Sequence, residues 1–230
     1  MYEIAFNDVR NSIHGLVVTK RPSVPAPEET VETFTVAGRE GILTGERRLQ
    51  PIEIAVELAF RCRPDDWAEQ MRNVKQWLQG SGTFKQSDDV NWFYKVNHVQ
   101  ITAVERELKR YGRITATFNC DPYMYSIAGQ REYSIDDESI LNNRYETCHP
   151  MYIFPGSGMQ TITVNGNTAT ISGSGAVVVD TDRMITYTQT THGIESTRLT
   201  GDYEDLYLLS GENEISSSGP VTIIPNWRTR

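Results

Sequence analysis

The clearest pattern in the chain is a strict alternation between Ile52 and Phe60. Large apolar residues occupy every even position of this segment, while glutamate and alanine share the odd positions, among them Glu53 and Glu57. A period of two is typical of a β-strand that has one face in a hydrophobic core. The opposite face, which carries Glu53 and Glu57, is therefore expected to meet water or a polar interface.

A second strand is expected from Arg113 to Cys120, where apolar and polar residues alternate in the same way. The stretch from Phe93 to Leu108 is also rich in strand formers, but its apolar parity changes near Asn97–His98, which predicts a β-bulge. Between these two stretches, Lys109–Gly112 is predicted to turn the chain into a long hairpin.

One helix is expected, from Asp66 to Gln79. Asp66 and Glu69 have the spacing of a capping box, and Gly80 supplies a left-handed stop. Apolar residues recur at helical spacing along one stripe, which predicts packing against a sheet. The stripe consists of Trp67, Met71, Val74, Trp77 and Leu78.

The segment Arg21–Thr30 contains three prolines and cannot form a central strand, because proline has no amide donor. We expect an extended, exposed loop here. Two roles remain open for it: a plain surface connector, or an arm that touches a neighbouring subunit.

The second half of the chain shows short strand patterns separated by turns. Asn165–Gly166 predicts a tight hairpin because both residues tolerate positive φ. A second strand pair is expected across Thr181–Arg183, and a last strand over Gly219–Pro225. About a hundred residues of this kind predict a β-sandwich.

The expected fold class is therefore mostly β with one helix, in two domains. The stretch Ser126–Asn143 is polar and has no clear period, so the boundary is placed before it. The first domain is expected to span residues 1–125 and the second residues 126–230. A length of 230 residues fits two ordinary β domains.

Composition narrows the function classes. A hydrophobic fraction of 38% is enough to build cores, while a net charge of -8 argues against a protein that grips nucleic acid through its phosphates. The N-terminus does not resemble a signal peptide, and no apolar run approaches the ~18 residues of a membrane span. Three widely spaced cysteines, Cys62, Cys120 and Cys148, predict buried free thiols and folding in a reducing cytoplasm.

No catalytic or metal motif is recognisable. The histidines His14, His98, His149 and His192 lie at no metal-ligand spacing, and adjacent Cys148 and His149 would point to opposite faces of a strand. Nucleotide, zinc and serine-nucleophile motifs are absent from the sequence, and two glycine-rich segments, 156–158 and 173–175, are expected to be turns. We therefore expect no cofactor, no metal and no catalytic residue.

Two alternatives rest on residue types alone. Acidic residues at 180, 182, 202, 204 and 205 leave a sandwich glycosidase open, although such an enzyme needs two carboxyl groups held across a cleft. Aromatic residues of the second domain would suit a sugar-binding sandwich, although sandwich cores use the same residues. These aromatic residues are Tyr152, Phe154, Tyr187, Tyr203, Tyr207 and Trp227.

Several segments, in their order along the chain, resemble the distal tail (Dit) proteins of long-tailed bacteriophages (siphoviruses) that infect Gram-positive hosts. Gly38-Arg39-Glu40-Gly41 is similar to the Gly-Arg-Asp-Gly turn of that family, with Glu40 in place of the usual aspartate. The helix end Trp77-Leu78 follows the alternating strand. Phe118 to Tyr123, with Pro122, resembles the motif that closes the family's first domain.

The second half continues the resemblance. Leu208 to Ile215, which contains Gly211 and Asn213, resembles a Pro-Gly-x-Asn motif of the family. Further matching segments are Trp92–Val96, Asn142-Asn143, His149–Ile153, Val179–Thr181 and Trp227-Arg228. No single motif is specific, but their shared order extends over nearly the whole chain.

The resemblance implies a virion structural protein of the baseplate, or tail tip. The first domain would be related to tail-tube proteins and would form a hexameric ring, single or double, while the second would be a galectin-like β-sandwich. Partners would be the major tail protein, the tail-associated lysin or fibre protein and receptor-binding proteins. The protein would be made in the host cytoplasm, act in host adsorption at the distal end of the tail, and let DNA pass without binding it.

Two hypotheses follow for the sites. Glu53 and Glu57 are candidates for a lumen or interface face, because an acidic channel repels DNA and lets it slide. A carbohydrate-binding β-sandwich protein remains the alternative function, although the chain has no room for a large sugar-binding insertion.

Overall fold

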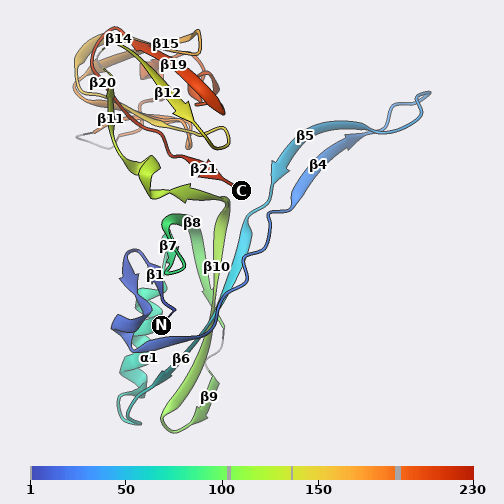
Figure 1. Ribbon diagram of the computed structural model, residues 1–230, viewed down its shortest axis with the longest axis vertical. Coiled ribbons are helices and arrows are strands. Elements are labelled where there is room, and N and C mark those ends of the chain that lie inside the picture. The colour runs from blue at the N-terminus through green and yellow to red at the C-terminus, as the bar shows by residue number, and fades with distance from the viewer. Residues whose placement is uncertain (1, 103–104, 136, 190–192) are drawn as a thin grey trace. The chain divides into compact units, whose positions relative to one another are not determined.

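The computed structural model describes residues 2–102, 105–135, 137–189 and 193–230, and of residues 105–108 and 174 it describes the backbone alone. Contacts divide the chain into two compact units, one that runs to Met124 and includes Arg230, and one that comprises Tyr125–Thr229. Strands dominate both units (Figure 1). Among the described residues there is one α-helix, so the mostly β class with one helix is confirmed. No described helix is long and apolar enough to cross a membrane.

The main sheet of the described chain has nine strands, seven of which lie in the order β2-β1-β7-β8-β10-β6-β3, while β9 and β21 also pair with β10. The strands are β1 (Ile4–Phe6), β2 (Val9–Arg10), β3 (Leu16–Lys20), β6 (Ile52–Arg61), β7 (Gly82–Gln86), β8 (Asp89–Ile101), β9 (Glu105–Leu108), β10 (Tyr111–Ser126) and β21 (Arg228–Thr229). A short 3-10 helix, η1 (Asn11–His14), leads into β3.

The antiparallel pair β6–β10 forms the centre of this sheet. Its register runs without a bulge from Tyr111 opposite Arg61 to Cys120 opposite Ile52. Apolar residues therefore face each other across the pair at every second position, as the alternation predicted. The pairing with β6 ends before Pro122, which has no amide hydrogen to donate.

The helix α1 (Trp67–Trp77) packs against the apolar face of the sheet. Met71, Val74 and Trp77 are buried in the same cluster as the inward residues of β6 and β10, and Leu78 just beyond the helix joins them. Trp67 is partly buried at its edge, so the predicted stripe is confirmed. Trp77 Nε1 also donates to the Phe6 carbonyl at 3.3 Å, which ties the helix to β1.

The predicted capping box is wrong. Asp66 adopts a helical conformation (φ -86°, ψ -1°), and its side chain makes no capping hydrogen bond. A side-chain cap requires the extended backbone typical of an N-cap, whereas Asp66 already lies in the helical turn and its carbonyl accepts from the Gln70 amide at 2.9 Å. Gly80, at φ +89°, does supply the left-handed stop.

Two further expectations concern this region. The first differs in detail, and the second agrees in position. The turn between β9 and β10 consists of Lys109–Arg110 alone, because Tyr111 and Gly112 already pair within β10. In β8, Tyr94 and Val96 are buried while Asn97 and His98 are both exposed, and Val99 and Ile101 are half-buried beyond them. The predicted change of parity therefore occurs at Asn97–His98.

A separate two-stranded sheet joins β4 (Glu29–Phe34) to β5 (Leu43–Leu49). The proline-rich segment before it is irregular only as far as Glu28, so the predicted loop Arg21–Thr30 is two residues too long. Neither β4 nor β5 was expected from periodicity. In Figure 1 this ribbon extends from the end of the irregular segment as a hairpin.

The second unit contains two five-stranded sheets, ordered β11-β20-β13-β16-β17 and β12-β19-β14-β15-β18. The strands are β11 (Tyr133–Ile135), β12 (Glu138–Asn143), β13 (Met151–Phe154), β14 (Ser157–Val164), β15 (Asn167–Ser174), β16 (Val177–Asp180), β17 (Ile185–Thr188), β18 (Leu199–Thr200), β19 (Gly211–Ser217) and β20 (Val221–Ile224). Three 3-10 helices connect them: η2 (Ile127–Gln130), η3 (Ser196–Arg198) and η4 (Glu204–Leu206).

The two sheets of this unit share one apolar core. Tyr152 and Phe154 from the first sheet lie in the same buried cluster as Ile162, Val164 and Ile215 from the second. Facing sheets that bury a common layer of side chains form a sandwich. The predicted β-sandwich is therefore confirmed.

The turns of the sandwich follow the sequence, with one exception. Asn165 (φ 51°) and Gly166 (φ 86°) form the predicted hairpin turn with both residues in the left-handed region. The glycine-rich segments 156–158 and 173–175 are not simple turns, because Gly158 pairs with Gly173 inside the long β14–β15 hairpin. Apolar periodicity stops before these glycines, although the backbone pairing continues.

All three cysteines are free thiols, as predicted. Cys120 and Cys148 are buried, and Cys62 is partly exposed. Burial raises the pKa of the Cys120 thiol to about 12. This side chain is therefore protonated at physiological pH and packs as a small apolar residue.

Replacement of Gly112 is expected to destabilise the first unit. A Cβ at this position would come within 2.5 Å of both the Phe60 ring and the Trp67 ring. Gly112→Val should therefore cost about 1–3 kcal/mol, as other overpacked core variants do. Urea unfolding followed by tryptophan fluorescence measures the change. Thr117→Val, on the outward face of β10, is the control, and equal stability of the two variants would contradict the prediction.

Candidate interface surfaces and a polar cluster

The outward face of β6 is where the structure places Glu53 and Glu57. Both are exposed, and they lie opposite Asn119 and Thr115 of β10, on the face away from the core. The strand alternation therefore does present these two carboxylates to solvent, as predicted.

The same face carries positive charge as well. Arg61, at the end of β6, and Arg113, on β10, are also exposed, and both lie on the outward side by the alternation of their strands. An Arg61 guanidinium carbon lies 5.4 Å from the Tyr111 ring centroid, in a cation–π contact. The face is therefore mixed in sign, and Lys20 of β3, which is also exposed, is the register partner of Glu57.

The hairpin β4–β5, residues Glu29–Leu49, is named the arm here. Its register shifts between Val31 and Thr33, and the amide of Gln50 donates to the carbonyl of Glu28 at 2.8 Å to close its base. No described residue of the arm is buried, on either face of the ribbon. A two-stranded ribbon without a hydrophobic layer is only marginally stable by itself.

The tip of the arm contains the motif Gly38–Gly41. Gly38 (φ 85°) and Gly41 (φ 91°) both adopt the left-handed conformation, and the Arg39 amide donates to the Val36 carbonyl at 3.2 Å. Arg39 and Glu40 are exposed. The motif that the family resemblance rests on is therefore the turn of the arm, and no described partner covers it within the chain.

Apolar side chains remain exposed near this tip. The exposed fractions are 48% for Phe34, 46% for Val36 and 66% for Ile42. Solitary exposed apolar residues are common on protein surfaces. A group of three on a ribbon with no core of its own indicates a surface that another molecule covers.

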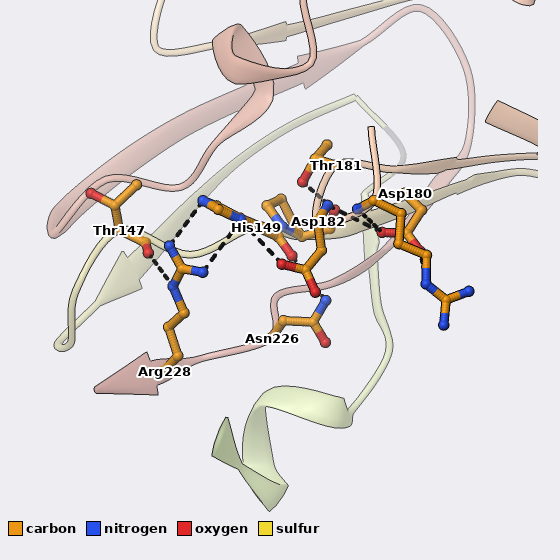
Figure 2. Close-up of polar contacts among 9 residues, drawn as sticks. Thr147, His149, Asp180, Thr181, Asp182, Asn226 and Arg228 are labelled. Atoms are coloured by element: carbon orange, nitrogen blue, oxygen red, sulfur yellow. Dashed lines mark hydrogen bonds and ion pairs between the residues drawn. The ribbon is translucent and has the colours of Figure 1, made fainter. Parts of the chain in front are cut away.

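The second unit holds a polar cluster around a buried arginine, shown in Figure 2. Arg228 is 7% exposed, and its Nε donates to the Thr147 carbonyl at 2.8 Å. Its Nη2 lies 2.9 Å from His149 Nε2, and His149 Nδ1 lies 3.2 Å from Asp182 Oδ1. Since a guanidinium only donates, Nε2 accepts from it, and Nδ1 donates to the carboxylate. The imidazole is thus held between Arg228 and Asp182.

Stacking fixes the plane of the same imidazole. The Tyr207 ring lies parallel to it, with the centroids 4.0 Å apart and 17° between the planes. Burial raises the pKa of Tyr207, and the neighbouring Glu204 raises it further. The Tyr207 hydroxyl is therefore protonated at physiological pH. This arrangement fixes the orientation of both rings.

Asn226 joins the two ends of the second unit beside this cluster. Its backbone amide donates to the Gly129 carbonyl at 2.9 Å, and its side-chain Nδ2 donates to the His149 carbonyl at 2.9 Å. The Ser126 amide donates to the Trp227 carbonyl at 2.8 Å. A Cβ on Gly129 would lie 2.4 Å from the Trp227 nitrogen, so only glycine fits there. The segment Asn226–Arg228 thus packs within the second unit.

Asn213, one of the motif residues, is a buried structural residue. It is completely buried, its Oδ1 accepts from the Leu209 amide at 2.8 Å, and its Nδ2 donates to the Leu209 carbonyl at 2.9 Å. Asn165 Nδ2 donates to the same Oδ1 at 2.8 Å. Gly211, at φ +101°, allows the tight loop that this side chain fills. The motif therefore holds the loop before β19 to the Asn165–Gly166 hairpin.

The other motif residues are structural as well. Trp77 and Leu78 belong to the core of the first unit. Pro122 is half-buried in β10, just beyond the end of the β6 pairing. The structure does not bring the motif residues together into one site. They are distributed among the arm tip, the first core and the second sandwich.

The aromatic residues proposed for sugar binding are mostly unavailable. Tyr152, Phe154 and Trp227 lie in the core of the sandwich. Tyr203 contacts Thr186 Oγ1 through its hydroxyl at 3.0 Å, and Tyr207 stacks on His149. A sugar-binding face needs aromatic rings open to solvent, and of these six residues only Tyr187, Tyr203 and Tyr207 are partly exposed.

The histidines are dispersed. His14 stacks on Trp77 with centroids 4.9 Å apart, His98 is exposed on β8, and His149 lies in the polar cluster. His192 lies outside the described residues. Among the residues that the structure describes, no three His, Cys, Asp or Glu side chains are grouped so that they could hold a metal ion. Asp180 instead accepts from the amides of Asp182 and Arg183, at 3.1 and 3.2 Å, and so caps the β16–β17 turn.

The comparisons with known proteins bear on the fold. The chain is similar to the SPP1 Dit (gp 19.1) protein, described as a paradigm of the hub adsorption apparatus in Gram-positive infecting phages, with a TM-score of 0.69 and 14% identity over 97% of each chain. It is also similar to chains of the phage P2 baseplate in its activated conformation, with Ca (TM-score 0.55, 12% identity) and with Sr (TM-score 0.56, 11% identity), over 100% of this chain and 97% of each of those. No family model and no curated protein matches the sequence. The resemblance to Dit proteins is confirmed at the level of the fold.

Loss of the Arg228 guanidinium is expected to loosen the polar cluster. Arg228→Met leaves the Thr147 carbonyl and His149 Nε2 without their donor, which costs about 1–3 kcal/mol for buried acceptors. Hydrogen exchange of the Ser126 amide, which bonds the neighbouring Trp227 carbonyl, should become faster. Arg183→Met removes a side chain that is 75% exposed and is the matched control. Unchanged exchange at Ser126 in Arg228→Met would contradict this role.

Proposed function

We propose that this chain is a non-catalytic structural hub of a bacteriophage tail tip. In this proposal six copies form a ring that joins the tail tube to the host-adsorption apparatus, and DNA passes through the channel of the ring. The observation that carries the proposal is the match to the SPP1 Dit fold over 97% of both chains. Because both units take part in the match, it supports a whole adaptor of the same design.

The arm supports self-association. It is solvent-exposed on both faces and has apolar residues near its tip, so a neighbouring molecule is needed to cover it. Head-to-tail contacts between identical copies close into a ring when the rotation between them allows it. An arm that reaches from each copy to the next is such a contact.

The partners follow from position in the tail. The first unit would contact the major tail protein on one side of the ring and the tail-associated lysin or fibre protein on the other. The second unit, a galectin-like sandwich in this proposal, would hold receptor-binding proteins in the virion. Its two five-stranded sheets and buried aromatic residues support a protein-binding scaffold over a sugar-binding module.

The face of β6 that carries Glu53 and Glu57 is proposed as part of the channel wall. Carboxylates that line a channel repel phosphates and keep DNA from adhering during passage. The exposed Arg61 and Arg113 on the same face limit this effect. The proposed repulsive zone is therefore the half of the face around the two glutamates.

A ring has a mass that is easily measured. Multi-angle light scattering of the purified chain should give about 157 kDa, six times the 26.1 kDa of one chain, or twice that value for a double ring. Negative-stain images should show six-fold particles with a central hole. Addition of the partner tail proteins serves as the second condition, because they can promote closure. A mass of one chain under both conditions would contradict the proposal.

Charge reversal on the proposed wall should create DNA binding. Glu53→Lys with Glu57→Lys changes the charge of each copy by four, so the ring should retain duplex DNA at low salt and release it as salt increases. Fluorescence anisotropy of a labelled duplex measures this binding, and the unaltered ring should show none. Glu204→Lys with Asp205→Lys makes the same charge change on the second unit. Equal DNA binding by both variants would argue against a channel role for β6.

A further inference from the structure

A groove with a basic rim lies beside the end of α1. Its apolar floor consists of Leu78, Val99 and Ile101, and Arg72 and Lys75 of the helix stand at its edge. The groove has a volume of about 660 Å³, within the range of pockets that hold a ligand or a peptide side chain. Both basic residues are exposed, although the chain as a whole has a net charge of -8.

The arm has one face with the complementary character. Phe34 pairs with Leu43 across the arm, so these two apolar side chains lie together on one face. A Cβ at Gly45 would lie 2.7 Å from the Phe34 ring and 3.4 Å from Glu32, so the glycine leaves space for both side chains on that face. Glu46 forms an ion pair with Arg48 at 2.8 Å on the exposed surface, and Glu32 is near enough to raise the pKa of Arg48 as well, so this face carries two carboxylates and one guanidinium.

The opposite face of the arm is different. It carries Glu29 and Arg47, which form an ion pair at 3.8 Å, together with Val31, Thr33 and Thr44. It presents no aromatic side chain. The two faces of the arm are thus chemically distinct, and the Phe34 face combines an aromatic side chain with two carboxylates and a single guanidinium, which leaves it net negative.

We infer that the Phe34 face of the arm of one copy docks in the α1–β8 groove of the next copy. Phe34 and Leu43 would cover Val99 and Ile101, and Glu32 and Glu46 would approach Arg72 and Lys75. This occupant is favoured because the charges are complementary and because the arm lacks any covering layer of its own. The inference rests on the proposed ring, since it requires a second copy beside the first.

The contact is heterologous, because the arm and the groove are different surfaces of the same chain. Each copy therefore offers one arm and one groove, and contacts of this kind continue from copy to copy until they close. A ring with an even number of copies can be built from two variants in alternation. Two kinds of copy that carry opposite changes can alternate around it.

Charge reversal and mixing test the inference. One variant reverses the groove, Arg72→Glu with Lys75→Glu, and the other reverses the arm, Glu32→Lys with Glu46→Lys. Each alone should assemble at least tenfold more weakly by light scattering, because like charges then face each other at every contact. An equimolar mixture should recover the assembly of the unaltered chain, since every arm in an alternating ring then meets an opposite charge. Docking of the arm within its own copy would give no such recovery.

Matched controls separate this contact from general charge effects. Glu29→Lys lies on the other face of the arm, and Arg63→Glu lies before α1 and outside the groove. Neither should weaken assembly, and thermal unfolding should show that all variants remain folded. If the unaltered chain assembles and both reversed variants assemble equally well, the inference is wrong while the ring stands, and the groove serves another partner or none. If the unaltered chain stays monomeric with and without its tail partners, the ring and the docking are both wrong.

Discussion

The pairing of β6 with β10 is the constraint on which the first unit depends. Ten consecutive residue pairs, from Tyr111–Arg61 to Cys120–Ile52, hold the two longest alternating patterns in one register. A shift by a single residue would move every apolar side chain of one strand to the solvent face. The helix, the arm base and the outward glutamates are all placed by this one register. The unit therefore tolerates little change along the pair, as the close packing of Gly112 against Phe60 illustrates.

The second unit depends on buried polar side chains to a greater degree. Its core is apolar, but its loops are held by Asn143, Asn213, Asn226 and Arg228, all of which are buried and hydrogen-bonded to backbone groups. Buried polar groups are costly unless they are paired, so a loop held in this way has one favourable arrangement. The motif residues Gly211 and Asn213 are explained by this architecture and need no ligand.

The arm differs from both cores, because none of its described residues is buried. It has a defined register and a turn with two left-handed glycines, yet neither of its faces is covered. A two-stranded ribbon of this kind is marginally stable by itself, and in the proposed ring a neighbouring copy would stabilise it. Because the two faces of the arm differ, only one of them is suited to the proposed contact with a neighbouring copy.

The sequence by itself determined the elements whose residues alternate between core and solvent. Ile52–Phe60, Arg113–Cys120, the helix stripe and the Asn165–Gly166 turn could be predicted because one face of each element is buried or one backbone conformation is demanded. The arm could not be predicted in this way. Its strands are exposed on both faces, so burial imposes no period on their residues, and only the Gly38–Gly41 turn marked its position. The polar cluster was equally hidden, because the segment with Thr147 and His149 is far from Asp182 and from Arg228 in the chain, and the three meet only when the sandwich closes. Tertiary structure alone decided which exposed residues form an arm or line a groove, since local sequence carries no information about which surfaces become neighbours.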